Sequence, residues 1–189
     1  MEELYMGKKI LAICASPRKN GNCETLVRAF MRGAEENGNE VRAYFASETK
    51  IEPCLACGMC YKTGKPCVQK DAINEIIPAF LEADIVLLAS PFYFHNFSAQ
   101  MYAFINRLYA IGNTNDHVYP KKDVILMVSS HSDREEDFEP LFAQYNNMLI
   151  GYMGWREIGR VMAHTYSERG EVAGTDFEKQ AEELGKSIR

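Results

Sequence analysis

The sequence predicts an α/β domain built around a five-stranded, parallel, doubly wound sheet. Three observations support this prediction. Short, continuous apolar runs, typical of strands buried on both faces, alternate with segments whose apolar residues recur at helical spacing. The chain of 189 residues suits one domain, and its 47% hydrophobic residues supply a packed core. No repeat or Pro/Gly/Ser-rich linker divides it, so one domain over residues 1–189 is expected.

The first half of the chain contains two predicted strands and one long helix between them. Residues 10–15 form a short apolar run, and residues 41–45 are a mixed run better suited to the edge of a sheet. Gly38 is a plausible end for the helix between them. One face of that helix carries the apolar residues Leu26, Val27, Phe30, Met31 and Ala34.

The second half contains the stronger strands. Residues 85–89 and 124–128 are apolar throughout and are expected to be central, and a last strand is expected within residues 155–163. One helix is expected over residues 72–81. Three others are indicated by apolar faces made of Met101, Phe104, Ile105 and Leu108; of Phe138, Leu141, Phe142, Tyr145 and Leu149; and of Phe177, Ala181, Leu184 and Ile188.

Charge and apolar content limit the class of protein. With 21 basic and 26 acidic residues the net charge is −5, which argues against a broad nucleic-acid or anionic-membrane surface. The first fifteen residues lack the basic start and long apolar stretch of a signal peptide, and no run approaches the roughly 18 apolar residues of a membrane span. A cytoplasmic protein is therefore expected, in which six cysteines indicate metal binding, redox chemistry or packing rather than a disulfide framework.

Ligands of doubly wound sheets bind beyond the carboxyl ends of the strands, which places the expected site in residues 16–23, 91–97 and 129–133. The first of these loops joins a strand to a helix and carries Arg18, Lys19 and Gly21, a composition that suits a phosphate group. An ordinary connecting loop is the alternative. The spacing from Cys14 to Arg18 is too short for a C-x5-R phosphatase loop, and neither a P-loop nor a G-x-G-x-x-G motif occurs.

Four cysteines lie in an insertion at about residues 50–72, with the spacing C-x2-C-x2-C-x6-C. Three cysteines at steps of three can bind three corners of an iron–sulfur cubane, and a later fourth can complete it. Structural zinc fits less well because a second C-x2-C pair is missing. The candidate ligands are Cys54, Cys57, Cys60 and Cys67.

Three segments together resemble the NADPH-dependent FMN reductase and iron–sulfur flavoprotein family, which has a flavodoxin-like fold. They are residues 16–22 (SPRKNGN), the cysteine segment 54–67, and residues 90–94 (SPFYF) leading into residues 105–107 (INR). The resemblance implies a three-layer sandwich with strand order 2-1-3-4-5. It also implies bound FMN, NAD(P)H as electron donor, and a small acceptor such as a free flavin, a quinone or a nitroaromatic compound. Because the flavin supplies the chemistry, no catalytic side chain is expected.

The resemblance also assigns residues to the flavin. The first loop is expected to bind its phosphate through Ser16, Arg18, Asn22 and Cys23, although many relatives carry threonine at the position of Cys23. The second loop is expected to lie along the isoalloxazine ring through Pro91, Phe92, Tyr93, Phe94 and Asn96. Ser129 and Ser130 of the third loop are expected at the ring edge, whereas His95, His131 and Asp133 are left unassigned.

The cysteine insertion leaves two interpretations open. It resembles the [4Fe–4S] motif of iron–sulfur flavoproteins, in which case the protein is an electron carrier between FMN and a redox protein such as ferredoxin. Similar loops also occur in relatives that act as plain FMN reductases, where the insertion shapes the flavin pocket or a subunit surface. A thiol sensor or metal-binding module without flavin is a third interpretation. A homodimer or homotetramer is expected, because relatives often place the flavin between subunits.

Overall fold

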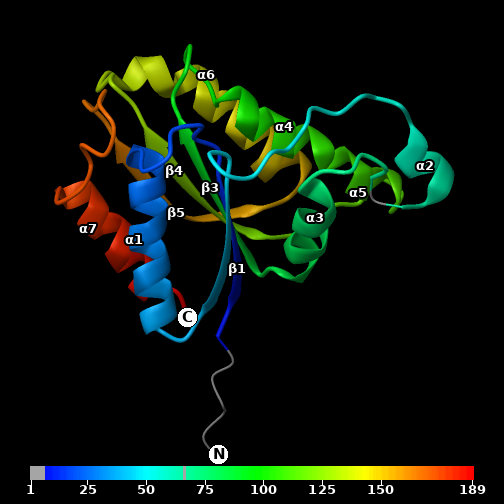
Figure 1. Cartoon of the computed structure of the whole chain (residues 1–189), viewed down its shortest axis with the longest axis horizontal. Coiled ribbons are helices and arrows are strands. Elements are labelled where there is room, and N and C mark those ends of the chain that lie inside the picture. Colours follow the sequence, from blue (N-terminus) through cyan, green and yellow to red (C-terminus); the bar gives the residue numbers. More distant parts are fainter. Residues whose placement is uncertain (1–6, 66) are drawn as a thin grey trace, which may run out of the picture.

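The computed structural model describes residues 7–65 and 67–189 (Figure 1). Five strands form one sheet in the order β2-β1-β3-β4-β5, and every neighbouring pair is parallel. This order and direction confirm the predicted flavodoxin-like topology. The strands are β1 (Lys9–Cys14), β2 (Glu40–Phe45), β3 (Ile85–Pro91), β4 (Asp123–Ser129) and β5 (Arg156–Ala163).

Helices cover both faces of the sheet and complete a three-layer sandwich (Figure 1). On one face lie α1 (Asn22–Glu36) and α7 (Asp176–Lys186); on the other lie α3 (Ile73–Glu82), α4 (Ala99–Arg107) and α6 (Glu135–Tyr145). Strand β1 serves both layers because successive side chains point to opposite faces. Leu11 and Ile13 join the core beneath α3, α4 and α6, whereas Ile10 and Ala12 join the core beneath α1 and α7.

Burial along the strands explains the apolar patterns in the sequence. All seven residues of β3 are buried, as are all of β4 except Asp123, because helices cover them on both faces. Strand β2 buries only Phe45, which matches its predicted place at the edge. In the register of the sheet Cys14 lies beside Ala89, and Pro91 lies beside Ser129. The loops that follow β1, β3 and β4 therefore leave the sheet side by side, at the carboxyl ends of its strands.

Three local features differ from the expected elements. The helix expected to reach Leu108 is followed by a second short helix, α5 (Tyr109–Asn113), and the helix expected to reach Leu149 changes after Tyr145 into a π-helix over Asn146–Tyr152. Side-chain periodicity marks a buried face and does not report the change in backbone hydrogen bonding. The cysteine segment contains an unexpected helix, α2 (Met59–Thr63), whose residues are all at least partly exposed and so lack an apolar pattern.

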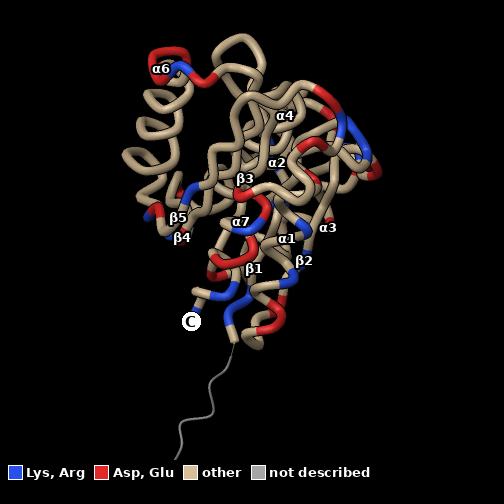
Figure 2. The backbone as a smooth tube through the Cα atoms, turned by 90° about the vertical axis from the view of Figure 1, so that its left-hand side faces the viewer, with Lys and Arg blue, Asp and Glu red and all other residues tan. Residues whose placement is uncertain are grey.

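Charged residues of both signs are interspersed over the surface, as Figure 2 shows for one side of the molecule. The first turn of α6 is acidic, with Glu135, Glu136 and Asp137 in succession beside Arg134 (Figure 2). Among the helices of the described residues, none combines the length and the apolar character needed to cross a membrane.

Candidate functional site

The loops that follow β1, β3 and β4 enclose a cavity of about 300 Å³ at the carboxyl edge of the sheet. Nine of the eleven residues assigned to the flavin line it, and Phe94 and Asn96 do not. Three further residues complete the lining: His131, Tyr166 and Ser167. The nine are Ser16, Arg18, Asn22, Cys23, Pro91, Phe92, Tyr93, Ser129 and Ser130.

The loop after β1 places the start of α1 against this cavity. The Ser16 hydroxyl accepts a hydrogen bond from the Arg18 amide (3.2 Å), and the Gly21 amide donates to the Arg18 carbonyl (3.2 Å). A Cβ on Gly21 would lie 2.9 Å from that carbonyl oxygen, so glycine permits the tight turn. Gly21 is the N-cap and supplies no side chain to the first turn of α1. The N–H groups of the first turn of α1 and the helix dipole favour an anion here.

The connection from β5 to α7, which is not among the expected site loops, also lines the cavity. Arg18 Nη1 donates to the Ser167 carbonyl (2.9 Å), and Asn22 Nδ2 donates to the Glu168 carbonyl (3.0 Å). Tyr166 joins the third loop through its amide, which donates to the Ser130 carbonyl (3.0 Å). The position of this segment in the chain could have predicted its role. It follows the carboxyl end of β5 and therefore lies at the same end of the sheet as the three expected loops.

The loop after β3 turns tightly and separates its predicted ring contacts. Reciprocal backbone hydrogen bonds join Tyr93 and Asn96 (2.9 and 3.0 Å), and both residues between them have positive φ angles, 47° for Phe94 and 60° for His95. Phe92 packs on Phe138 with ring centroids 4.6 Å apart. Phe94, at the tip of the turn, is fully exposed. The structure therefore brings Phe92 and Tyr93 to the cavity, while the assignment of Phe94 to the ring stays a prediction.

The side chain of Asn96 is engaged within the protein rather than in the cavity. Its Oδ1 accepts from the Tyr102 hydroxyl (2.6 Å) and from the Phe97 amide (3.0 Å), and its Nδ2 donates to Gln144 Oε1 (3.0 Å). These bonds fix the turn to α4 and α6. A direct contact of Asn96 with the flavin remains a prediction.

Ser129 and Ser130 are buried at the end of β4, and His131 beyond them reaches the β5–α7 segment. His131 Nδ1 lies 2.8 Å from the Ser167 hydroxyl oxygen. Cys23 is buried beside Ser129, and burial raises the pKa of its thiol well above the ordinary value. This part of the cavity therefore carries a neutral thiol and not a thiolate.

The four cysteines of the insertion line a second, larger cavity of about 520 Å³. All four are free thiols; Cys54 and Cys57 are exposed, and Cys60 and Cys67 are half-buried. Within residues 7–65 and 67–189, no group of three or more His, Cys, Asp or Glu side chains is placed to hold a metal ion. A cluster binds each cysteine at a different iron, so its four ligands stand farther apart than the ligands of one ion. The structure shows four free thiols on one cavity, and a cluster held by them stays a prediction.

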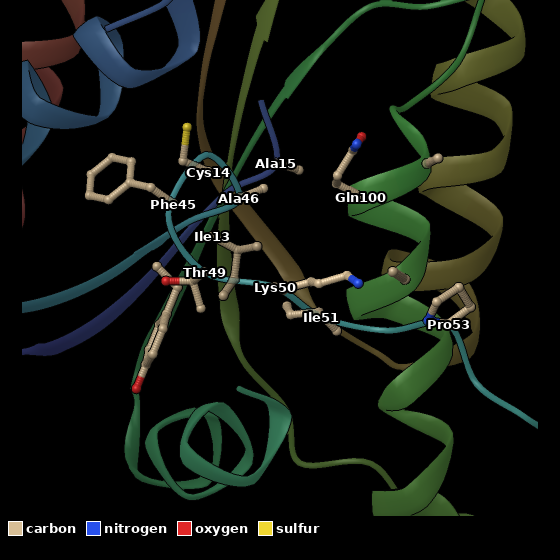
Figure 3. Close-up of a pocket in the computed structure, with 13 residues that line it drawn as sticks. Ile13, Cys14, Ala15, Phe45, Ala46, Thr49, Lys50, Ile51, Pro53 and Gln100 are labelled. Carbon is tan, nitrogen blue, oxygen red and sulfur yellow. The ribbon is translucent and has the colours of Figure 1, made fainter. Parts of the chain in front are cut away.

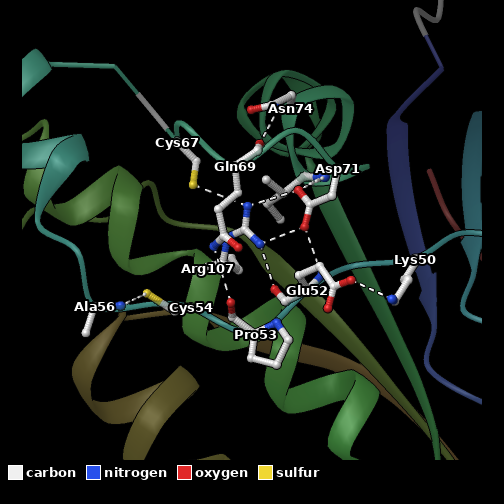
Figure 4. A network of polar contacts seen from close by, with 11 residues as sticks. Lys50, Glu52, Pro53, Cys54, Ala56, Cys67, Gln69, Asp71, Asn74 and Arg107 are labelled. Atoms are coloured by element: carbon white, nitrogen blue, oxygen red, sulfur yellow. Dashed lines mark hydrogen bonds and ion pairs between the residues drawn. The ribbon is translucent and has the colours of Figure 1, made fainter.

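A buried ion pair joins this cavity to the body of the fold (Figure 4). Arg107, at the end of α4, binds the Asp71 carboxylate through both terminal nitrogens (2.7 and 2.9 Å), and its Nη1 also donates to the Glu52 carbonyl (2.6 Å). Arg107 Nη2 lies 3.2 Å from the Cys67 sulfur. Burial alone would raise the pKa of Asp71, but hydrogen bonds from Arg107 and the Glu52 amide hold it below the ordinary value.

A third hollow, of about 280 Å³ and mainly apolar, lies between the ends of β1 and β2 and the outer side of α4 (Figure 3). Ile13, Ile51 and Gln100 are among its lining residues. It also includes Ala15, which precedes Ser16 of the first cavity, and Pro53, which precedes Cys54 of the second. The two candidate sites are thus separated by this hollow and by helix α4.

Helix α4 begins at one site and ends at the other. Its N-cap, Ser98, accepts a hydrogen bond from the Met101 amide (3.3 Å) and donates from its hydroxyl to the Ala15 carbonyl (2.9 Å) beside the first cavity. Its last residue, Arg107, contacts Cys67. At 1.5 Å per residue, the nine residues of α4 separate these ends by about 12 Å.

The chain is similar to known proteins in sequence and in fold. A family model described as NADPH-dependent FMN reductase matches residues 8–163. An iron–sulfur flavoprotein from Archaeoglobus fulgidus is 33% identical over 180 residues, which cover 95% of this chain and 78% of that protein. A second iron–sulfur flavoprotein, from Methanosarcina thermophila, is 38% identical over 99 residues, covering 52% of this chain and 51% of that protein.

Two solved structures share the fold. An NAD(P)H:quinone oxidoreductase from Methanothermobacter marburgensis aligns with a TM-score of 0.69 at 14% identity, covering 95% of this chain and 96% of that one. An azoreductase from Bacillus anthracis aligns with a TM-score of 0.68 at 16% identity, covering 96% of this chain and all of the other. At these identities the alignments establish the fold alone.

Proposed function

Because the chain belongs to the NADPH-dependent FMN reductase family and is a flavin oxidoreductase, we propose that FMN binds in the cavity at the ends of β1, β3 and β4. A hydride from NAD(P)H then passes through the flavin to a small acceptor such as a free flavin, a quinone or a nitroaromatic compound. The observation that carries this proposal is that nine of the residues expected to bind the flavin line one cavity.

The phosphate end of the cavity is formed by the loop after β1. The first turn of α1 presents backbone N–H groups, and the Ser16 hydroxyl and the Arg18 guanidinium lie beside it. Arg18 uses Nη1 for the Ser167 carbonyl, and its remaining N–H groups can bind a phosphate oxygen. Arg18 therefore serves both the anion and the β5–α7 segment that closes this end.

The ring end is formed by the loops after β3 and β4. Pro91, Phe92 and Tyr93 line this end, and Ser129 and Ser130 on the neighbouring strand and loop add hydroxyl groups beside them. Phe92 packs on Phe138, which supports its ring at the cavity. When bound, FMN would supply hydride chemistry, and the protein supplies binding, orientation and partial exclusion of water. Tyr93 is partly exposed at the rim, where a nicotinamide and then an acceptor can approach.

The proposal is tested by measuring FMN affinity in a matched pair of variants. We expect Arg18→Met to weaken FMN binding about 10- to 100-fold, because charge-assisted hydrogen bonds to phosphate are lost. Lys19→Met is the control: this neighbouring cation pairs with Glu48 (2.7 Å) and does not line the cavity. Equal FMN affinity in the two variants would place the phosphate elsewhere.

A second candidate function rests on the four cysteines that line one cavity. We infer that Cys54, Cys57, Cys60 and Cys67 can hold a [4Fe–4S] cluster, which would supply one-electron chemistry beside the flavin. The protein would then relay electrons to or from a redox protein such as ferredoxin. Exposed apolar side chains on this cavity offer a contact surface: Leu55, Tyr61, Val68 and Tyr109. The chain between residues 53 and 70 has three lysines and no acidic residue, which favours an acidic partner.

Anaerobic purification distinguishes the two functions. Flavin absorbance without iron supports the simple reductase, whereas FMN with about four irons and four sulfides per chain supports the electron relay. The same preparation tests the proposed assembly. We expect a homodimer or homotetramer by light scattering, consistent with the fully exposed Phe94 beside the flavin cavity. A monomer at micromolar concentration would contradict this expectation.

A further inference from the structure

Two side chains from outside the insertion donate to its cysteine sulfurs. Arg107 Nη2 lies 3.2 Å from the Cys67 sulfur, and Asn113 Nδ2 lies 3.3 Å from the Cys60 sulfur. Arg107 ends α4 and Asn113 ends α5, so both donors come from helices outside the insertion. The Cys54 sulfur accepts only from the nearby Ala56 amide (3.4 Å), and over the described residues no hydrogen bond reaches the Cys57 sulfur.

The contacts of Arg107 account for all four of its terminal N–H groups. Two bind the Asp71 carboxylate, one binds the Glu52 carbonyl, and one is directed at Cys67. The side chain is only 1% exposed, so its orientation is set by these partners. Glu52 precedes the first cysteine of the insertion, and Asp71 follows the last. Arg107 thereby binds both ends of the insertion and fixes the position of Cys67 relative to α4.

We propose that Arg107 and Asn113 are positioning residues that preset Cys67 and Cys60 and raise the reduction potential of a [4Fe–4S] cluster bound there. The proposal rests on the second candidate function. When such a cluster accepts one electron, no bond forms or breaks, and the added negative charge is shared with its cysteine sulfurs. An N–H donor stabilises that charge, so the reduced form gains more than the oxidised form. The carboxylate of Asp71 offsets the charge of Arg107. The effect of Arg107 on the reduction potential therefore comes from the N–H group directed at Cys67.

The decisive measurement is a spectroelectrochemical titration of anaerobically purified protein with dithionite as reductant. We expect Asn113→Leu to shift the cluster equilibrium about tenfold toward the oxidised form, which for a one-electron couple is 59 mV. Asn115→Leu is the matched control, since Asn115 lies two residues away and donates to the Val118 carbonyl instead of a sulfur. The flavin potential, read in the same titration, should stay unchanged in both variants. Equal cluster potentials in the two variants would overturn the role of Asn113.

Arg107 is tested with two substitutions. Lysine retains the charge but lacks the planar fork, so we expect Arg107→Lys and Arg107→Met to lower the cluster potential alike. Retention of the wild-type potential in Arg107→Lys would show that charge, and not the directed N–H group, acts on Cys67. Retained FMN binding would confirm that either variant is folded, because the flavin cavity does not include Arg107.

A measurement on metal-free protein separates failure of this proposal from failure of the cluster. If Arg107 presets the insertion, backbone amides of residues 52–71 should be protected from hydrogen exchange without metal, and Arg107→Met should remove that protection. If the wild type purifies anaerobically without iron and still shows this protection, the electron relay is refuted and the positioning role is supported. Unprotected amides in both the wild type and Arg107→Met would refute the positioning role, whatever the iron content.

Discussion

The two cavities of this protein are built in different ways. The flavin cavity lies at the ends of adjacent parallel strands, where the register of the sheet brings residues 16, 91 and 129 together. The cysteine cavity lies in an insertion and depends on Arg107 and Asn113 from helices outside it. The first is a consequence of the fold, and the second is joined to the fold by polar contacts and by packing of Cys60 and Cys67 against the core. Changes to those contacts should therefore affect the cysteine cavity without affecting the flavin.

The largest effect is expected from breaking the buried ion pair. Asp71→Ala leaves the buried Arg107 guanidinium without its carboxylate, which should lower the free energy of unfolding by about 3–5 kcal/mol if the insertion unfolds with the rest. Denaturant titration measures the loss. The double variant Asp71→Leu/Arg107→Met should recover part of it, because no unpaired charge remains. FMN affinity should stay within twofold of the wild type if the two cavities are independent.

An exposed pair provides the control for this prediction. Arg156 Nη2 lies 2.7 Å from Asp123 Oδ2, where β5 and β4 begin, and the arginine side chain is largely exposed. Asp123→Ala should cost no more than about 1 kcal/mol, because solvent screens the pair. Losses of similar size in Asp71→Ala and Asp123→Ala would show that the pair beneath the cysteine cavity is not structurally important.

The buried Asp71–Arg107 pair predicts that the stability of the fold depends on pH. Because the folded-state pKa of Asp71 lies below its ordinary value of 3.8, the carboxylate stabilises the fold at any pH above that ordinary value. This contribution is lost as the pH falls through the lowered folded-state pKa. Between pH 5 and pH 2, the stability of Asp71→Asn should therefore decline less steeply than that of the wild type. Parallel declines, measured by denaturant titration at each pH, would contradict the prediction.

Helix α4 connects the cavities, and its N-cap tests whether they are independent. Ser98 accepts from the Met101 amide and donates to the Ala15 carbonyl, so Ser98→Ala removes a cap and leaves a buried carbonyl unpaired. We expect a loss of about 1–2 kcal/mol in the free energy of unfolding. FMN affinity should also fall, since Ala15 precedes the phosphate loop, while the titration of the cluster should not change. A change at the cysteine cavity would show that α4 transmits the disturbance.

What the sequence could reveal follows from how each cavity is built. Strand patterns predicted the parallel sheet, and Arg18 and Ser129 could then be assigned because strand ends in a parallel sheet meet at one edge. The four cysteines were recognisable by their spacing. Arg107 belongs to the INR segment that carries the family resemblance, but neither its role nor that of Asn113 could be predicted, because their partners lie 40 and 53 residues away and no local pattern marks a donor to sulfur. The contribution of Tyr166 was missed because the expected site included only the loops after three strands, although the last strand was expected to end by residue 163.

The smallest effect is expected at Cys23, in the first turn of α1. Its thiol is buried and neutral at the start of α1, so it can offer a phosphate only a weak S–H donor. Cys23→Thr supplies a hydroxyl at the same place and should tighten FMN binding by about 1 kcal/mol, close to fivefold. Cys23→Ala is the control, since it removes the thiol without adding a donor and should not improve affinity. If threonine and alanine weaken binding equally, the side chain at this position packs against the cavity wall and does not contact the phosphate. Such a result would leave the backbone of α1, Ser16 and Arg18 as the anion site, and would show that the fold itself, more than any one side chain, provides that site.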